Sequence, residues 1–428
     1  MKDKSLTKSI TFNDFKKEIL NDYKTIVISR ETSLLGRKEV LSGKAKFGIF
    51  GDGKELPQIA MAKAFRRGDH RSGYYRDQTF MLALNEISVQ QIFSALYANT
   101  DLKKEPMSGG RQMGSHFMSN YIDEKGDFID STQKYNSSAD ISPTSGQMPR
   151  LLGLAMASKL YRDGSFNSKN FSNNGNEVAW GTIGNASTSE GPFFEVFNAA
   201  GVHQVPMIIS VWDDEYGISV NNSYQTTKSS ISKALHGFKR DKSNKGFEIY
   251  TVDGWDYQSL IQIYEHSSNF CRENHIPILI HVKNLTQPIG HSTSGSHERY
   301  KNKSRLEWEM KYDCNRKMRE WILDNNLSDL SKIEQIEKDC IEFVKSEKKA
   351  AWDNFQKDII VERDSFIKLI KSLVHQYKSK DLAEIANSLL RLKDLGRKDV
   401  MSAARRSLRL ENSSDFFEKI NNWVSDYK

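Results

Sequence analysis

The sequence lacks the features that define several classes of protein. Its three cysteines, Cys271, Cys314 and Cys340, are odd in number and far apart, so they form neither a zinc pattern nor a disulfide framework. A reducing compartment fits them best. No apolar run is long enough to span a membrane, and residues 1–17 carry lysines without the apolar centre of a signal peptide. We therefore expect a soluble, cytoplasmic protein.

The charge of the chain lacks a block of one sign. The 428 residues include 62 Lys and Arg and 55 Asp and Glu, and the net charge of +7 is spread along the chain. Hydrophobic residues make up 38%, which is ordinary for a globular protein and excludes general disorder. The positive excess is compatible with anionic ligands. Nucleic-acid binding is the weaker alternative, because no basic run is interleaved with aromatic residues.

The character of the sequence changes twice, which predicts three regions. Residues 1–45 are charged and have the spacing of an amphipathic helix. Residues 46–305 alternate glycine-rich loops, short apolar runs and helical segments, which predicts an α/β domain. Residues 306–428 contain little glycine and much charge, and their apolar residues recur at helical spacing without visible chemistry. The expected strands of the middle region are 178–183, 206–212, 247–252 and 278–282.

Two polar side chains follow neighbouring predicted strands. Asn185 comes after the run 178–183, and Asp214, 29 residues later, comes after the run 205–212. The segment 190–200 between them has the pattern of a packed helix. Such a strand–helix–strand unit places both strand ends side by side at one edge of a parallel sheet. An amide and a carboxylate there suit magnesium, which prefers oxygen ligands. Polar strand ends without a ligand are the simpler alternative.

Four other polar segments carry weaker signals. Residues 51–53, Gly-Asp-Gly, lack a polar partner after a second strand and are interpreted as a turn. Arg76 follows two tyrosines and offers a planar set of donors suited to phosphate. Residues 142–147 are rich in hydroxyl groups and could contact a heteroaromatic ligand or a monovalent cation, or simply cap the next helix. His291 lies in a polar loop, where an imidazole serves catalysis or phosphate binding, or has no role.

Taken in order, these segments resemble the α subunit of thiamine-diphosphate-dependent 2-oxo acid dehydrogenases, in particular the branched-chain type. They also resemble the α part of bacterial forms that carry α and β in one chain. The similarity covers roughly residues 30–310, and several ordered motifs are specific even where each is weak alone. The motifs are Tyr75-Arg76-Asp77, Gly110-Arg111-Gln112-Met113, Ser142-Pro143, Gln147-Met148-Pro149, Ser189-Glu190-Gly191, Tyr216-Gly217-Ile218-Ser219, Val252-Asp253-Gly254 and Gly290-His291-Ser292-Thr293-Ser294. The resemblance implies the thiamine-diphosphate-binding α/β fold, a parallel sheet flanked by helices.

The resemblance also implies a role for each matching residue. His291 and Arg76 would be catalytic-site residues at the diphosphate of the cofactor. Asn185, Asp214 and the backbone carbonyl of Tyr216 would hold Mg²⁺. The residues that would contact the cofactor are Tyr75, Arg76, Ser142, Ala186, Ser187, Glu190, Tyr216 and His291.

The chain departs from the family pattern at four places. The family has an acid first and an asparagine second at the cation site, whereas Asn185 and Asp214 are exchanged. One carboxylate and one amide remain, which indicates a retained metal site. Ala186 replaces a glycine and asks for a backbone conformation open to a side chain. Trp212 replaces a polar residue, which puts phosphate contacts there in doubt. The loop 142–147 matches a potassium-binding loop of some relatives, but glycine replaces its threonine.

The implied activity is oxidative decarboxylation of a 2-oxo acid, with transfer of the acyl unit to a lipoyl group on an acyltransferase. The expected substrates are branched-chain 2-oxo acids such as 3-methyl-2-oxobutanoate, and pyruvate or acetoin is the alternative. In the family a β subunit supplies a glutamate to the cofactor, and no part of this chain resembles it. We therefore expect a β subunit as partner. A non-catalytic subunit that has lost the cofactor is the remaining alternative.

Overall fold

The computed structural model describes residues 11–166, 170–410 and 413–426, and the chain divides into two compact units, residues 1–346 and 347–428. The helices of the first unit are α1 (Phe12–Leu41), α2 (Glu55–Ala64), α3 (Gln78–Ala83), α4 (Val89–Leu96), α5 (Gln147–Arg162), α6 (Gly191–His203), α7 (Ile231–Ala234), α8 (Tyr257–Asn274), α9 (Lys303–Lys311) and α10 (Cys314–Asp324). The boundary falls within α11 (Leu330–Tyr377). The second unit also contains α12 (Lys380–Leu390), α13 (Arg397–Ser407) and α14 (Ser414–Asp426).

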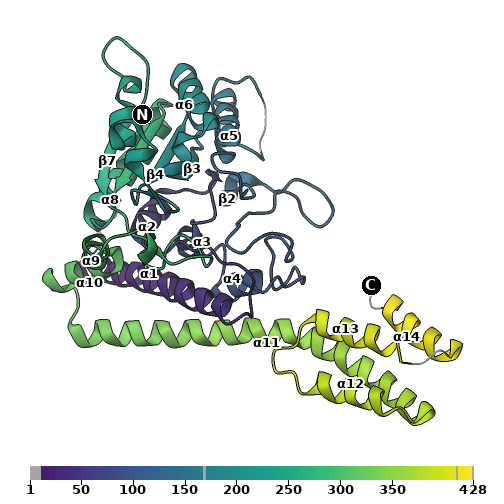
Figure 1. The fold of residues 1–428 in the computed structure, drawn as a ribbon. Helices are drawn as coiled ribbons and strands as arrows, with labels where there is room; N and C mark the ends of the chain where they lie inside the picture. The colour runs from purple at the N-terminus through teal and green to yellow at the C-terminus, as the bar shows by residue number, and fades with distance from the viewer. Residues whose placement is uncertain (1–10, 167–169, 411–412, 427–428) are drawn as a thin grey trace. The chain divides into compact units, whose positions relative to one another are not determined.

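A six-stranded parallel sheet lies at the centre of the first unit (Figure 1). Its strands are β1 (His70–Ser72), β2 (Asn136–Ser137), β3 (Ala179–Gly184), β4 (Met207–Trp212), β7 (Glu248–Asp253) and β8 (Ile278–Lys283). They lie in the order β2-β1-β3-β4-β8-β7, and every pair is parallel. A small antiparallel hairpin of β5 (Tyr216–Gly217) and β6 (Val220–Asn221) follows β4. The predicted fold class, a parallel sheet flanked by helices, is confirmed.

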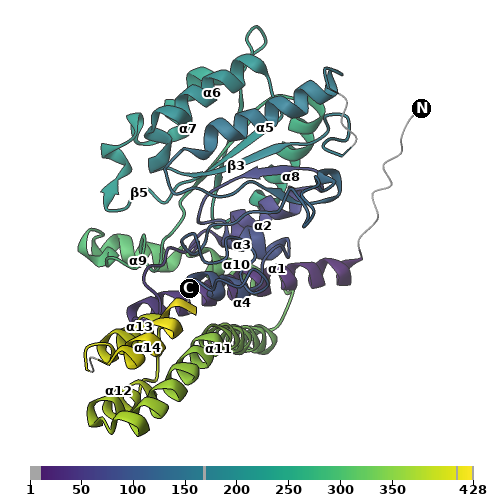
Figure 2. The ribbon, with the colours of Figure 1, turned by 90° about the vertical axis from the view of Figure 1, so that its right-hand side faces the viewer.

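Helices cover both faces of this sheet. Successive side chains of a strand point to opposite faces, so each strand contributes to two cores. On β3, Trp180 packs in a core with residues of α1, α2 and α8, whereas Ala179 and Ile183 pack in a second core with α5 and α6. Figure 2 shows the sheet between these two layers. All six residues of β4 are buried, as expected for a strand covered on both faces. The strand ends, rather than the faces of the sheet, are therefore available to a ligand.

The four predicted strands agree with β3, β4, β7 and β8 to within one residue at each end. The strands β1 and β2 were not predicted. They are three and two residues long, and β1 has the polar sequence His70-Arg71-Ser72. Arg71 is fully buried because its guanidinium is paired with Asp77 and lies 3.0 Å from Asp140. The burial of this charge depends on partners outside the strand, at sequence separations of 6 and 69 residues, so local hydrophobicity gave no signal for β1.

The second unit is a cluster of helices around its own apolar core, which includes residues of α11, α12, α13 and α14. Its start at residue 347 differs from the predicted start of the charged helical region at 306. The helices α9, α10 and the first part of α11 belong to the first unit. Met318, Ile322 and Ile333 pack in the same core as α1 and α2, which explains the later division.

The structure also bears on the expectations about membrane spans and cysteines. Within the described part of the chain, no helix is long and apolar enough to cross a bilayer. The three cysteines are buried free thiols.

Candidate active site

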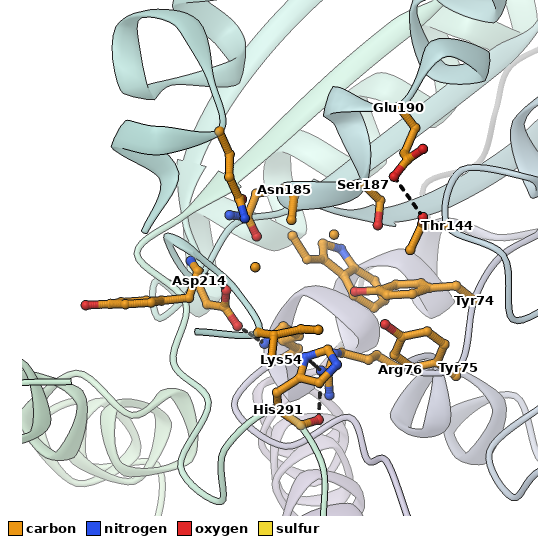
Figure 3. A pocket seen from close by; sticks show the side chains of 17 residues that line it. Lys54, Tyr74, Tyr75, Arg76, Thr144, Asn185, Ser187, Glu190, Asp214 and His291 are labelled. Atoms are coloured by element: carbon orange, nitrogen blue, oxygen red, sulfur yellow. Dashed lines mark hydrogen bonds and ion pairs between the residues drawn. The ribbon is translucent and has the colours of Figure 1, made fainter. Parts of the chain in front are cut away.

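The carboxyl ends of β3 and β4 meet at one edge of the sheet and bring the two predicted cation ligands together. Gly184 pairs with Trp212 in the parallel register, so Asn185 and Asp214 follow at neighbouring positions. Both side chains line a cavity of about 300 Å³, shown in Figure 3. The cavity is lined by Lys54, Tyr74, Tyr75, Arg76, Thr144, Gly184, Asn185, Ala186, Ser187, Glu190, Trp212, Asp214, Tyr216, Gly217, Ile218, Gln225 and His291.

A tight turn after β3 places Asn185 at the cavity. Asn185 precedes a short 3₁₀ helix, Ala186–Ser189, and its backbone carbonyl accepts a hydrogen bond from the Thr188 hydroxyl at 2.6 Å. Ala186 has a negative φ, so its side chain causes no backbone strain. The expected conformation open to a residue other than glycine is therefore present. Asn185 is 3% exposed, and its Nδ2 has no hydrogen-bond partner among the described residues.

Asp214 is held by an ion pair with Lys54, a residue to which the sequence analysis gave no role. Lys54 Nζ lies 2.9 Å from Asp214 Oδ2, and the two side chains are 2% and 10% exposed. The same ammonium donates to the Thr286 carbonyl at 3.2 Å and to Gln287 Oε1 at 2.6 Å. The Tyr216 N–H donates to Asp214 Oδ1 at 3.2 Å. Both carboxylate oxygens of Asp214 thus accept hydrogen bonds.

The pKa values of this pair reflect burial and opposite charge. Burial raises the pKa of Asp214, but the charge and hydrogen bond of Lys54, together with the charges of Lys301 and Arg76, outweigh it, and the pKa lies below its ordinary value. Burial lowers the pKa of Lys54, and the charge of Asp214 opposes that shift. Asp214 is therefore an ionised carboxylate at neutral pH.

Arg76 and His291 form a second polar cluster in the same cavity. Arg76 Nη2 donates to His291 Nδ1 at 2.9 Å and to the His291 carbonyl at 3.0 Å, and Nη1 donates to the Phe50 carbonyl. Burial and the adjacent guanidinium lower the pKa of His291 to about 3, so the ring is neutral near pH 7. Since a guanidinium only donates, Nδ1 accepts and the ring proton lies on Nε2. His291 is thus a neutral donor beside a fixed cation.

Aromatic rings form one wall of the cavity. The ring centres of Tyr74 and Tyr75 are 4.9 Å apart, and the ring centre of Trp212 lies 5.9 Å from that of Tyr74. Trp212 Nε1 donates to Ser210 Oγ at 2.7 Å, so Trp212 offers the cavity an indole face and no free donor. This agrees with the doubt about phosphate contacts at that position. Tyr74 Oη is buried without a partner among the described residues, although it borders the cavity.

The hydroxyl-rich segment 142–147 contributes to the rim of the cavity at one residue. Thr144 Oγ1 donates to Glu190 Oε1 at 3.1 Å, and Ser187 lies beside them (Figure 3). Ser142, predicted to contact the cofactor, does not line the cavity, because its hydroxyl lies 3.0 Å from His116 Nε2. The Gln147 side chain, part of the predicted potassium loop, donates to the Thr182 carbonyl at 3.0 Å.

The hairpin after β4 closes another side of the cavity. Tyr216, which was predicted to contact the cofactor and to hold the cation through its carbonyl, is the first residue of β5 and lines the cavity. A Cβ added at Gly217 would lie 2.5 Å from Ala186 Cβ and 2.3 Å from Gln225 Nε2. Only glycine fits there without displacing the turn that follows β3. Glycine at 217 and alanine at 186 are therefore matched in size.

The residues at this site suit a diphosphate ester better than a metal ion alone. In the described residues, no cluster of three His, Cys, Asp or Glu side chains could hold a metal. Asn185, Asp214 and the Tyr216 carbonyl would provide only three oxygen ligands, and Asp214 is already paired with Lys54. In contrast, Lys54, Arg76 and His291 provide two positive charges and a neutral donor for phosphate oxygens.

Sequence reasoning found most of the lining residues and missed Lys54. The lysine follows the Gly-Asp-Gly segment that was interpreted as a turn, and the structure confirms a turn at 52–53. Lys54 is the N-cap residue of α2, where the helix dipole disfavours a positive charge. The burial of this lysine at an unfavourable helix position is visible only in the structure, so the sequence carried no signal for its role.

A parallel α/β sheet with positive charges and amide groups at its carboxyl edge defines an enzyme fold that binds an anionic cofactor at the strand ends. Residues 23–359 match the family described as "Dehydrogenase E1 component", and the chain belongs to this family. The match confirms the resemblance drawn from the sequence motifs. Membership in the family implies thiamine diphosphate as the cofactor.

Individual relatives fall into two groups by name. The 2-oxoisovalerate dehydrogenase subunit alpha of Bacillus subtilis (strain 168) is 27% identical over 301 residues, 69% of this chain and 79% of the relative. The pyruvate dehydrogenase E1 component subunit alpha of Rickettsia prowazekii (strain Madrid E) is 23% identical over 337 residues, 78% of this chain and 91% of the relative. At identities of 27% and 23%, neither relative decides which 2-oxo acid is the substrate.

Proposed function

We propose that this chain is the α subunit of a dehydrogenase that oxidatively decarboxylates branched-chain 2-oxo acids, such as 3-methyl-2-oxobutanoate. One observation carries the proposal: Arg76, His291 and Asp214 converge on one cavity at the strand ends, as the motif resemblance requires. The relative from Bacillus subtilis supports the choice of substrate. The non-catalytic alternative is disfavoured because the charged groups of the cavity are intact.

The residues of the cavity would bind and orient the cofactor. Arg76 uses three N–H donors within the protein, so two of its five remain for a diphosphate oxygen. His291 would donate from Nε2 to the same group. The rings of Tyr75 and Trp212 exclude water on one side. When bound, thiamine diphosphate supplies the carbon nucleophile and the electron sink for the loss of carbon dioxide. The protein contributes positioning and charge neutralisation.

We propose that Mg²⁺ accompanies the diphosphate, with Asn185 Oδ1, Asp214 Oδ1 and the Tyr216 carbonyl as protein ligands. Oxygen atoms of this kind, together with phosphate oxygens and water, form the usual magnesium environment. The Nδ2 group of Asn185 has no partner among the described residues, and as a donor it would face a phosphate oxygen rather than the metal ion. A potassium ion at the loop 142–147 is a further part of the proposal, although the Gln147 side chain is already engaged by Thr182.

We further propose a β subunit and a lipoyl-bearing acyltransferase as partners. The cavity contains one glutamate, Glu190, and its carboxylate accepts the Thr144 hydroxyl at the rim. A general acid–base group for the aminopyrimidine of the cofactor would therefore come from another chain. The acyl unit formed in the cavity would pass to the lipoyl group of the acyltransferase.

The proposal is tested by purifying the full chain with and without a co-expressed β subunit of the same family. Oxidative decarboxylation of 3-methyl-2-oxobutanoate and of pyruvate, and oxidative cleavage of acetoin, are each followed with an artificial electron acceptor. We expect activity only from the assembled complex, and the highest kcat/KM with the branched-chain acid. A higher kcat/KM with pyruvate would replace the substrate assignment. Full activity of the isolated chain would refute the need for a partner.

A further inference from the structure

Lys54 places a positive charge next to Asp214, the proposed carboxylate ligand of the metal ion. Its ammonium is buried at the cavity and contacts Asp214 directly, as Figure 3 shows. An ammonium has three N–H donors, and the acceptors here are Asp214, the Thr286 carbonyl and Gln287 Oε1. Asp214 is the only acceptor of the three that carries a negative charge.

The position of Lys54 is fixed by the backbone before it. Gly53 has φ +80°, and a Cβ there would lie 2.1 Å from the Thr286 carbonyl oxygen. The neighbouring Asp52 accepts the Ile289 N–H at 3.0 Å, which joins the same two loops. These contacts hold the backbone before Lys54 against residues 286–289, so the lysine side chain reaches the cavity from an anchored position.

A divalent ion and this ammonium would share one carboxylate. Asp214 Oδ2 accepts from Lys54, and Oδ1 accepts the Tyr216 N–H. A metal bound to either oxygen would lie within a few ångströms of Nζ, and buried like charges at that separation repel strongly. Lys54 thus opposes a metal ion at Asp214, while it attracts an anionic diphosphate in the same cavity.

We propose that Lys54 is a tethered cation that takes over much of the role of the divalent ion in binding the diphosphate. The inference rests on the proposed function, because it assumes that the cavity binds thiamine diphosphate. Lys54 and Arg76 together neutralise two negative charges of the diphosphate without an added ion. Cofactor binding by this chain therefore depends only weakly on Mg²⁺.

The experiment measures thiamine diphosphate affinity by calorimetry on the assembled complex, in EDTA and in saturating MgCl₂. The wild type is compared with Lys54→Met, which keeps an apolar stem of similar length, and with Lys46→Met, an exposed lysine in the preceding loop, as a matched control. We expect the wild-type and control affinities in the two buffers to agree within about threefold, and Lys54→Met to lose about thirtyfold in EDTA and recover with Mg²⁺.

A second measurement uses the metal alone. Titration of Mn²⁺, followed by electron paramagnetic resonance without cofactor, should show about tenfold tighter binding to Lys54→Met than to the wild type. Equal or weaker Mn²⁺ binding by the variant would overturn the proposed competition. If Lys54→Met does not fold, the wild-type comparison in EDTA and MgCl₂ still decides.

The outcomes separate this inference from the proposed function. Cofactor binding by the wild type only in MgCl₂ would overturn the role of Lys54 and leave the enzyme assignment intact. The absence of thiamine diphosphate binding in every buffer and variant would refute the cofactor assignment, and the inference with it.

Discussion

The cavity of the first unit and the core of the second unit differ in what they bury. Around the cavity, Lys54, Arg76 and Asp214 are buried together. In the described residues of 347–428, the buried polar side chains are Gln356 and Ser407, and the core is otherwise apolar. Burying a charge is costly unless it is paired, whereas burying apolar surface is favourable. The comparison indicates that the first unit bears the cost of buried charges at its cavity, whereas the second unit is stabilised mainly by apolar burial.

The largest expected effect tests the charged side of this comparison. Arg76→Met removes the buried guanidinium that fixes His291 and is expected to weaken thiamine diphosphate binding about 100-fold or more. Calorimetry on the assembled complex measures the affinity. Arg76→Lys is the control, because it keeps the charge and loses the planar donor geometry, and it should recover only part of the loss. An affinity unchanged in Arg76→Met would remove the diphosphate from this part of the cavity.

The second effect tests the apolar side. Leu382→Ala deletes a fully buried side chain of α12 and is expected to destabilise the second unit by about 2–5 kcal/mol. Hydrogen exchange of the α12–α14 amides in the full chain reports the loss. Thiamine diphosphate affinity should stay at the wild-type value, as should both properties in the exposed control Lys380→Ala. A parallel loss of affinity would show that the two units are energetically linked.

A smaller effect tests the exchanged cation ligands. In the Lys54→Met background, where cofactor binding depends on Mg²⁺, Asn185→Asp adds a carboxylate that repels the diphosphate, and Asp214→Asn removes the carboxylate ligand of the ion, so each change alone should weaken Mg²⁺-supported cofactor binding. The double variant again has one carboxylate and one amide. A double-mutant cycle in this background should give a favourable coupling of about 1–2 kcal/mol between the positions. Strictly additive losses would mean that the two residues do not share an ion.

The last prediction concerns pH. The pKa of His291 is lowered to about 3 in the folded chain, against about 6.5 in an unfolded chain. The unfolded state therefore binds a proton more readily, and the free energy of unfolding falls as the pH drops from about 6.5 toward 3, by at most about 1.4 kcal/mol per pH unit from this residue. Urea unfolding of His291→Gln should show a shallower fall over this range than the wild type. Identical pH profiles would show that His291 titrates normally.

The sequence predicted the central strands and the pairing of Asn185 with Asp214, because both depend on local pattern. Apolar runs of β3 and β4 reveal buried strands, and the strand–helix–strand order fixes which ends are neighbours. The reciprocal exchange at positions 185 and 214 was also visible without a structure.

What the sequence did not reveal depends on contacts between distant segments. Lys54 is recognised as part of the site only when the loop after β8 brings Thr286 and Gln287 against it. The buried strand β1 was missed because Arg71 is polar and its partners Asp77 and Asp140 lie outside the strand. Ser142 was assigned to the cofactor through its motif, but the structure directs its hydroxyl to His116. Long-range side-chain pairing is the common cause.

The three-way contact of Lys54 also bears on the biosynthesis of the enzyme. One ammonium joins the loop before α2 to Asp214 after β4 and to the segment beginning at Thr286, more than 230 residues downstream of Lys54. Such distant pairings form late, because the intervening chain must first be ordered. A nascent polypeptide that has not yet emerged past His291 would lack one of the three groups proposed to bind the diphosphate. Thiamine diphosphate should therefore bind only after β8 and the loop that follows it have been synthesised. Translation products that end before this loop should not bind the cofactor.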